Sequence, residues 1–204
     1  MYDDEVKAYD DADRITPPPA NPILFYGSSS IRLWSTLERD FPGVPIVNRA
    51  FGGSMLNECV ALMGRLVLPY HPRAVLLYAG DNDLGNGRSV ADVVESFREF
   101  ITRFDRSFPG RPLAYLSIKP SKARAHLRKE IEQSNALIRS EIAKWPAARY
   151  ISIFEAMLDP HGVPRDELFV EDFLHLSEKG YAVWRTAVTP FITEIMATSA
   201  ATSR

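Results

Sequence analysis

Three consecutive serines follow an apolar run near the start of the sequence, in the stretch ILFYGSSSIRLW. Gly27 ends the run, Ser28, Ser29 and Ser30 come next, and the residues after them have helical spacing. A serine in the first turn of a helix lies near unpaired backbone N–H groups and the positive end of the helix dipole, which favour developing negative charge. The three hydroxyls are therefore candidates for a helix cap, a phosphate-binding turn or a nucleophile.

Asp172 and His175 form a second candidate pair, in the stretch VEDFLHLSEKGY. A histidine that acts as a base needs an acceptor on its second ring nitrogen, which fixes the tautomer and stabilises the imidazolium. A turn that begins at Asp172 can bring its carboxylate to the His175 ring. The other histidines, His71, His126 and His161, lie in loops or among charged residues, and we interpret them as structural or solvent-exposed.

Two further segments carry groups that can stabilise negative charge. Asn82 offers a neutral amide that can donate to an oxyanion, and the pair Gly52-Gly53 can bring a backbone N–H close to a ligand. The acidic run around Asn82 begins like a calcium loop. However, Asn86 and Asp92 occupy the positions at which such a loop requires glycine and glutamate, so we expect no metal there.

The elements that must position these groups alternate along the chain. Short apolar runs predict strands at 22–28, 45–50, 74–80, 112–118 and 149–154. Helical spacing predicts helices at 31–41, 54–68, 89–107, 122–145 and 177–196. Alternation of this kind indicates an α/β fold with a five-stranded parallel sheet covered by helices on both faces.

In such a sheet the ligand site lies at the carboxyl ends of the strands. The serine turn, Gly53 and Asn82 each follow one of the predicted strands, so we expect them to meet at that edge. Lys119, in the stretch SIKPS, follows the fourth strand. It either lines the same pocket or is a solvated lysine beside a turn.

Composition narrows the class of protein and of partner. The 204 residues are expected to form one domain over 1–204, with a helix and a proline-rich entry at 1–20 and a frayed tail at 197–204. A net charge of −2 argues against nucleic acid as a partner. No apolar run approaches the roughly 18 residues needed to cross a membrane, so no stable membrane insertion is expected.

The compartment is predicted from the first residues and the cysteine content. The acidic N-terminus lacks the apolar core of a signal peptide. A single cysteine, Cys59, rules out an internal disulfide and fits a reducing compartment, so we expect a cytoplasmic protein. Cys59 lies in an apolar helical pattern and is interpreted as a small buried residue. The sequence does not indicate an oligomeric state.

Taken together in their order along the chain, these blocks resemble the SGNH hydrolases, also called GDSL-type esterases. The resemblance spans residues 22–192 and implies that Ser29 is the nucleophile, His175 the general base and Asp172 the residue that orients it. It also implies an oxyanion hole formed by the N–H groups of Ser29 and Gly53 and by the Asn82 side chain. The family's fold is a flavodoxin-like three-layer α/β/α sandwich, and no metal or cofactor is implied.

One position departs from the family pattern. The first block usually reads Gly-Asp-Ser, and Ser28 stands in place of the aspartate. The run LFYGSSSIRLW together with SIKPS resembles a GSSS-type subgroup of these esterases. We prefer Ser29 as the reactive hydroxyl because Gly27 lies two residues before it. Ser28 and Ser30 are expected to satisfy the backbone of the turn.

The sequence therefore predicts a serine esterase that hydrolyses acyl esters, with short-chain or sugar-acetyl esters favoured, through an acyl-enzyme on Ser29. The expected partner is a small acyl ester. One alternative is an acyltransferase that uses the same residues with an acceptor alcohol in place of water. Another is a non-catalytic flavodoxin-like module that binds a phosphorylated ligand at the serine turn, where Arg32 is the nearby cation.

Overall fold

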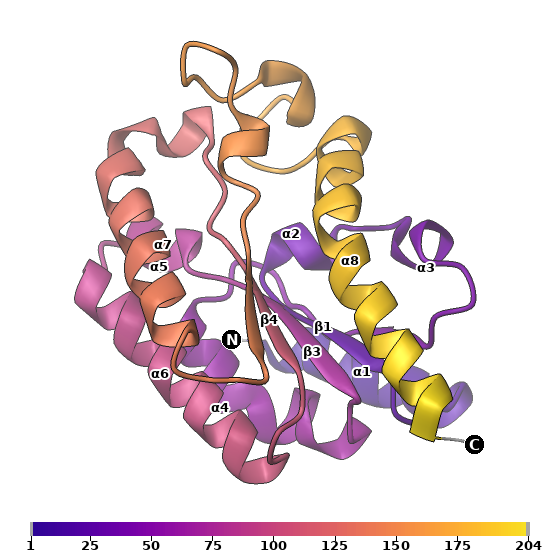
Figure 1. Cartoon of the computed structure of the whole chain (residues 1–204). Helices are drawn as coiled ribbons and strands as arrows, with labels where there is room; N and C mark the ends of the chain where they lie inside the picture. The colour runs from indigo at the N-terminus through magenta and orange to yellow at the C-terminus, as the bar shows by residue number, and fades with distance from the viewer. Residues whose placement is uncertain (1, 203–204) are drawn as a thin grey trace.

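A sheet of five parallel strands forms the centre of the molecule. The structure is a computed structural model that describes residues 2–202 (Figure 1). The strands are β1 (Ile23–Gly27), β2 (Ile46–Asn48), β3 (Ala74–Tyr78), β4 (Leu113–Leu116) and β5 (Ala148–Ile151), and their order across the sheet is β2-β1-β3-β4-β5. This is the flavodoxin-like strand order. The predicted α/β fold with a five-stranded parallel sheet is confirmed.

The sheet has a hydrophobic core on each face because successive residues of a strand point in opposite directions. On β1, Leu24 and Tyr26 belong to one core, whereas Ile23 and Phe25 belong to the other. All residues of β1 and β3 are buried. This double burial explains why these strands are near-continuous apolar runs in the sequence.

Helices cover both faces and give three layers (Figure 1). The first core lies under α1 (Asp3–Ile15), α4 (Leu56–Leu66), α6 (Val90–Ser107) and α7 (Arg128–Ile142). The second lies under α2 (Ser29–Arg32), α3 (Leu37–Asp40) and α8 (Glu178–Thr202). The remaining short helices are α5 (Asp81–Gly85), η1 (Leu68–Tyr70), η2 (Lys122–Leu127), η3 (Glu155–Met157) and η4 (Asp166–Leu168).

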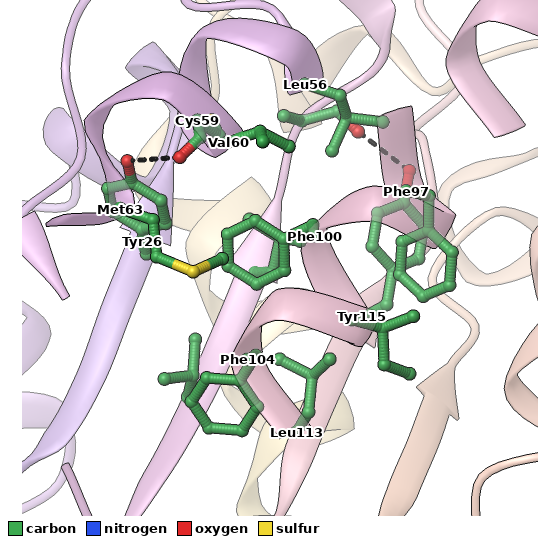
Figure 2. Close-up of a cluster of buried hydrophobic side chains, with 14 of the residues drawn as sticks. Tyr26, Leu56, Cys59, Val60, Met63, Phe97, Phe100, Phe104, Leu113 and Tyr115 are labelled. Atoms are coloured by element: carbon green, nitrogen blue, oxygen red, sulfur yellow. Dashed lines mark hydrogen bonds between the residues drawn. The ribbon is translucent and has the colours of Figure 1, made fainter. Parts of the chain in front are cut away.

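Aromatic side chains fill the core between the sheet and α6 (Figure 2). Tyr26 stacks on Phe100 with ring centroids 5.9 Å apart, and Phe97 meets Tyr115 edge-on at 5.1 Å. The buried Tyr26 hydroxyl donates to the carbonyl oxygen of Cys59 at 2.9 Å, which satisfies the one polar atom of that ring (Figure 2). Cys59 is itself fully buried, as predicted, and burial raises the pKa of its thiol.

Two helix predictions differ from the structure in detail. The helix expected at 31–41 is divided into α2 and α3, and the one expected at 122–145 begins as the 3₁₀ helix η2, with a non-helical backbone at Arg124. The predicted frayed tail, 197–204, falls partly outside the described residues, and the chain is helical as far as Thr202. Within residues 2–202 no helix has the length and apolar character needed to span a bilayer.

Phe100→Ala is expected to lower the free energy of unfolding by about 3–5 kcal/mol, because it leaves a cavity between Tyr26 and the neighbouring side chains of α6. Chemical denaturation followed by circular dichroism measures the loss. Leu137→Ala on α7 is the control, since the Leu137 side chain is 43% exposed and its truncation creates no cavity. Equal losses for the two variants would contradict the placement of Phe100 in the core.

Candidate active site

A glycine permits the turn that carries the three serines. Gly27 ends β1 with φ of +128°, and a Cβ atom at this position would lie 1.9 Å from the carbonyl oxygen of Tyr78 on the neighbouring strand. Only glycine fits such a close approach of two backbones. The next residue donates its N–H to the same oxygen, since Ser28 N lies 2.9 Å from Tyr78 O. The turn is therefore held to β3 by backbone contacts.

The three serines differ in exposure. Ser28 and Ser30 are each 1% exposed, whereas Ser29 is half-buried at the start of α2. The expectation that the Ser28 hydroxyl satisfies the backbone of the turn is wrong, because its Oγ is buried without a hydrogen-bond partner in the part of the chain that the structure describes. The backbone and a distant residue shape the turn instead, and Tyr181 of α8 donates to the Ser30 carbonyl at 2.9 Å.

A hydrogen-bonded chain joins Ser29, His175 and Asp172. The Oγ of Ser29 lies 3.0 Å from Nε2 of His175, and Nδ1 of His175 lies 2.6 Å from Oδ2 of Asp172. The other carboxylate oxygen of Asp172 accepts the N–H groups of Leu174 and His175 at 2.8 and 2.9 Å. Phe173 has a left-handed backbone, with φ of 52°, which turns the chain tightly enough for Asp172 to reach the ring.

Asp172 stays ionised down to low pH. Partial burial of its carboxyl opposes ionisation, but the hydrogen bonds from the His175 ring and from the two backbone N–H groups prevail and lower the pKa of Asp172 to about 2. An ionised Asp172 accepts from Nδ1–H and leaves Nε2 without a proton, facing the Ser29 hydroxyl. The arrangement is that of a base aimed at a hydroxyl.

The Asn82 side chain contacts the backbone of Ser54, the residue that follows Gly53. The Asn82 side chain, at the start of α5, donates one N–H to the carbonyl oxygen of Ser54 at 3.2 Å and has a second N–H left to donate. Gly53 is exposed and has a positive φ of +70°. Among residues 2–202, no hydrogen bond occupies the backbone N–H of Gly53 or of Ser29. Three donors are thus free in the segments that the sequence selected.

Residues 24–183 match the GDSL-like Lipase/Acylhydrolase family. The match covers well over half of the 204 residues and includes the serine turn and the Asp172–His175 turn. The chain belongs to this family. It is a GDSL-type acylhydrolase, and the enzyme class expected from the sequence is confirmed. No curated protein sequence matches the chain.

Solved structures share the fold of this acylhydrolase at low sequence identity. A GDSL-like lipase from Bacteroides thetaiotaomicron has a TM-score of 0.77 at 14% identity, over 93% of this chain and 97% of that one. A lipase/acylhydrolase from Enterococcus faecalis has a TM-score of 0.66 at 18% identity, over 87% and 96%. An acetylxylan esterase from Geobacillus stearothermophilus has a TM-score of 0.68 at 14% identity, over 86% and 94%.

Beneath the site of the acylhydrolase, Lys119 is buried in an ion pair. Its ammonium lies 2.7 Å from Oδ2 of Asp81 and 3.0 Å from the Tyr78 hydroxyl, and the residue is only 2% exposed. The sequence analysis left Lys119 as a pocket residue or a solvated lysine. Its burial contradicts the solvated lysine, because its charge is paired with Asp81 of α5. The pocket position stays a prediction.

Two residues that the sequence analysis did not select as site residues restrain the segments that carry Gly53 and Asn82. Asp83 accepts the N–H of Leu56 at 2.9 Å and so ties α5 to the loop that follows Gly53. Glu5, on α1, accepts the N–H of Gly52 at 2.7 Å. No pattern in the sequence predicts these two hydrogen bonds, since Asp83 is one acid of an acidic run and Glu5 is one of several charges on the first helix.

Arg32, the cation that a phosphate-binding turn would use, lies beside Glu5, with 3.5 Å between Arg32 Nε and Glu5 Oε1.

Within residues 2–202, no three His, Cys, Asp or Glu side chains gather in a cluster that could hold a metal ion.

Asp83→Asn is expected to change how stability depends on pH. Burial raises the pKa of Asp83 to about 6, against the lowering effect of the Leu56 N–H and of Arg88. The folded state therefore binds this proton more tightly than the unfolded state, and stability is lost as the pH rises from about 4 through 6, by roughly 3 kcal/mol. Relative to the wild type, Asp83→Asn becomes more stable over that range, which thermal denaturation at pH 4 to 7 measures.

Asp92→Asn is the control for this prediction. The side chain of Ser89 lowers the pKa of the exposed Asp92, so its contribution to stability is lost as the pH falls and has the opposite sign. If Tm of Asp83→Asn follows that of the wild type in parallel across the range, the buried carboxyl is not the source of the pH dependence.

Proposed function

We propose that this acylhydrolase is a serine esterase that acts on short-chain or sugar-acetyl esters through an acyl-enzyme on Ser29. The observation that carries the proposal is the hydrogen-bonded chain from Ser29 Oγ through His175 to Asp172, with distances of 3.0 and 2.6 Å. A nucleophile, a base and an orienting acid in this order are the parts that acyl transfer to a serine requires.

In the first half of the reaction, Nε2 of His175 removes the Ser29 proton while Oγ attacks the ester carbonyl. The carbonyl oxygen becomes an oxyanion, which accepts hydrogen bonds from the N–H groups of Ser29 and Gly53 and from the Asn82 side chain. The N–H of Ser29 is at the first position of α2, where no helical partner exists for it. His175 then gives its proton to the leaving alcohol, and the acyl group stays on Oγ.

In the second half, a water molecule takes the place of the alcohol. His175 removes a proton from the water, the hydroxyl attacks the acyl-enzyme, and the same three donors hold the second oxyanion. Collapse of this intermediate releases the carboxylic acid and returns the proton to Ser29. Asp172 remains ionised throughout and stabilises the imidazolium in both halves.

The preference for small acyl groups rests on several features. The acidic start of the sequence and its charged segments show no amphipathic lid for a lipid interface. Two proteins with the same fold, at 13% and 14% identity, are described as an acetyl esterase and an acetylxylan esterase, so the fold is compatible with small acyl groups.

We assign the chain to a GSSS-type subgroup because Ser28 stands where the family usually has aspartate.

A series of p-nitrophenyl esters from acetate to palmitate tests the proposal. The wild type is expected to hydrolyse the short esters fastest, and Ser29→Ala to lose this activity and covalent labelling by a fluorophosphonate. Ser28→Ala is the matched control, since the Ser28 hydroxyl has no partner in the described chain and its removal should leave turnover close to that of the wild type.

The other outcomes of this series decide between the alternatives. Transfer of the acyl group to an added alcohol or sugar, in preference to water, would indicate an acyltransferase. Equal activity of the wild type and Ser29→Ala would overturn the esterase proposal and favour the phosphate-binding module.

Asn82→Ala is expected to lower kcat by about 10²–10³-fold with little change in KM, because the lost donor acts on the oxyanion and not on the bound ester. Steady-state kinetics on the best p-nitrophenyl ester measures the effect. Asn57→Ala, at an exposed position of α4, is the matched control. A change confined to KM would show that Asn82 contacts the substrate in its ground state instead.

A further inference from the structure

A small cavity takes no part in the chemistry described so far, and none of the five residues of the proposed active site lines it. It has a volume of about 200 Å³ and lies between η2, the start of α7 and the segment 154–164, which crosses the top of the molecule in Figure 1. A cavity of this size has room for a few non-hydrogen atoms of a ligand. Its walls include Pro120, Ser121, Arg124, Ile131, Phe154 and Val163.

Two polar side chains of this cavity each have a buried atom without a hydrogen-bond partner in the described residues. Ser121 is 3% exposed, and its Oγ makes no hydrogen bond within the described chain. Arg124 is half-buried, its Nε is also unbonded, and residues 2–202 offer its guanidinium neither a hydrogen bond nor an ion pair. A buried donor without a partner costs free energy, and a guanidinium costs more than a neutral group. A ligand with oxygen acceptors would remove both costs.

The other cations around the cavity are already paired. Arg128 donates to Glu132 at 2.8 Å and to the carbonyl oxygen of Gly162, and it lies over the Phe154 ring. Lys122 pairs with Asp166 on η4. These groups therefore hold the walls of the cavity together and are not available to a ligand.

Asp81 does not neutralise Arg124, although it is the acid whose pKa Arg124 helps to lower. The carboxylate of Asp81 is in direct contact with Lys119 at 2.7 Å, and it contacts no nitrogen of Arg124 within 4 Å. Asp81 therefore forms its ion pair with Lys119, and Arg124 forms no ion pair among residues 2–202.

The segment that carries Arg124 is attached to both sides of the active site. A Cβ atom on Gly85, the last residue of α5, would lie 2.5 Å from Cζ of Arg124, so the guanidinium packs directly on the Gly85 backbone. Gly85 follows Asn82 by three residues, a rise of about 5 Å along the helix. On the other side, the N–H of Ala123 donates to the carbonyl oxygen of Phe173, between Asp172 and His175, at 3.3 Å.

We propose that Arg124 and Ser121 form a specificity site for an anionic group, a carboxylate carried by a short ester substrate. The planar guanidinium offers two parallel N–H groups to the two carboxylate oxygens, and the Ser121 hydroxyl offers a third donor. The proposal rests on the esterase function proposed above. It adds the class of substrate, namely the monoester of a small dicarboxylic acid or the ester of a small hydroxy acid.

Paired esters that differ in one carboxylate test this site. For the acyl side, 4-nitrophenyl hemiglutarate is compared with 4-nitrophenyl pentanoate, and for the alcohol side, O-acetylglycolate is compared with ethyl acetate. We expect kcat/KM of the wild type to favour the anionic member of at least one pair by about tenfold or more, with a preference that falls as salt is added.

Variants at Arg124 and Gly85 show whether the preference comes from this cavity. Arg124→Gln is expected to abolish the preference while hydrolysis of the neutral esters continues. Gly85→Ala keeps the charge but displaces the guanidinium, and it should reduce the preference as well. Arg103→Gln, an exposed arginine of α6 that pairs with Glu99, removes the same charge far from the cavity and should leave the preference unchanged.

Three results would overturn the proposal. The wild type could hydrolyse the neutral esters without preferring either anionic partner, which would leave the esterase function intact. Alternatively, the preference could survive in folded Arg124→Gln, or disappear equally in Arg103→Gln. If the wild type hydrolysed none of the four esters, the proposed esterase function itself would fail. Hydrolysis of the neutral esters therefore distinguishes failure of the specificity site from failure of the esterase function.

Discussion

The buried ion pair of Lys119 and Asp81 is the contact on which the rest of the site depends. It joins the chain beyond β4 to the chain beyond β3, and both partners are at least 96% buried. Burial disfavours the charge on Asp81, but the contact with Lys119 prevails and lowers the pKa of its carboxyl. The same carboxylate accepts the N–H of Asn82 at 3.0 Å. Removing either charge would leave the other buried and unpaired, a costly state next to Asn82.

The remaining groups reach the same edge of the sheet because all five strands are parallel. Some of these groups also need a particular backbone conformation to reach their place in the proposed site. Gly27 allows β1 to pass closely against Tyr78, and the left-handed Phe173 folds Asp172 back onto His175. The residues between these two backbone positions are ordinary helix and strand formers. The precision of the site therefore depends on a few backbone positions supported by two well-packed cores.

The sequence was sufficient for the strands and the main helices, because these follow from periodicity. The residues of the proposed site come from motifs of neighbouring residues, and their roles stay predictions. Contacts between distant segments could not be predicted from the sequence. Nothing local distinguishes Lys119 as a buried partner of Asp81, or Glu5 as the acceptor for Gly52. The break at Arg124 was also missed, since the apolar stripe of the predicted helix begins only at Leu127 and gives no signal for the backbone before it.

The helix α1 has a consequence for how relatives are compared. It lies before residues 24–183, the region that matches the family, yet Glu5 holds the Gly52 N–H and Tyr2 packs edge-on against Phe51 with ring centroids 4.7 Å apart. The loop that carries Gly53 is thus braced by a segment that a family comparison does not cover. Two homologues can agree at all five residues of the site and still differ in how rigidly that loop is held.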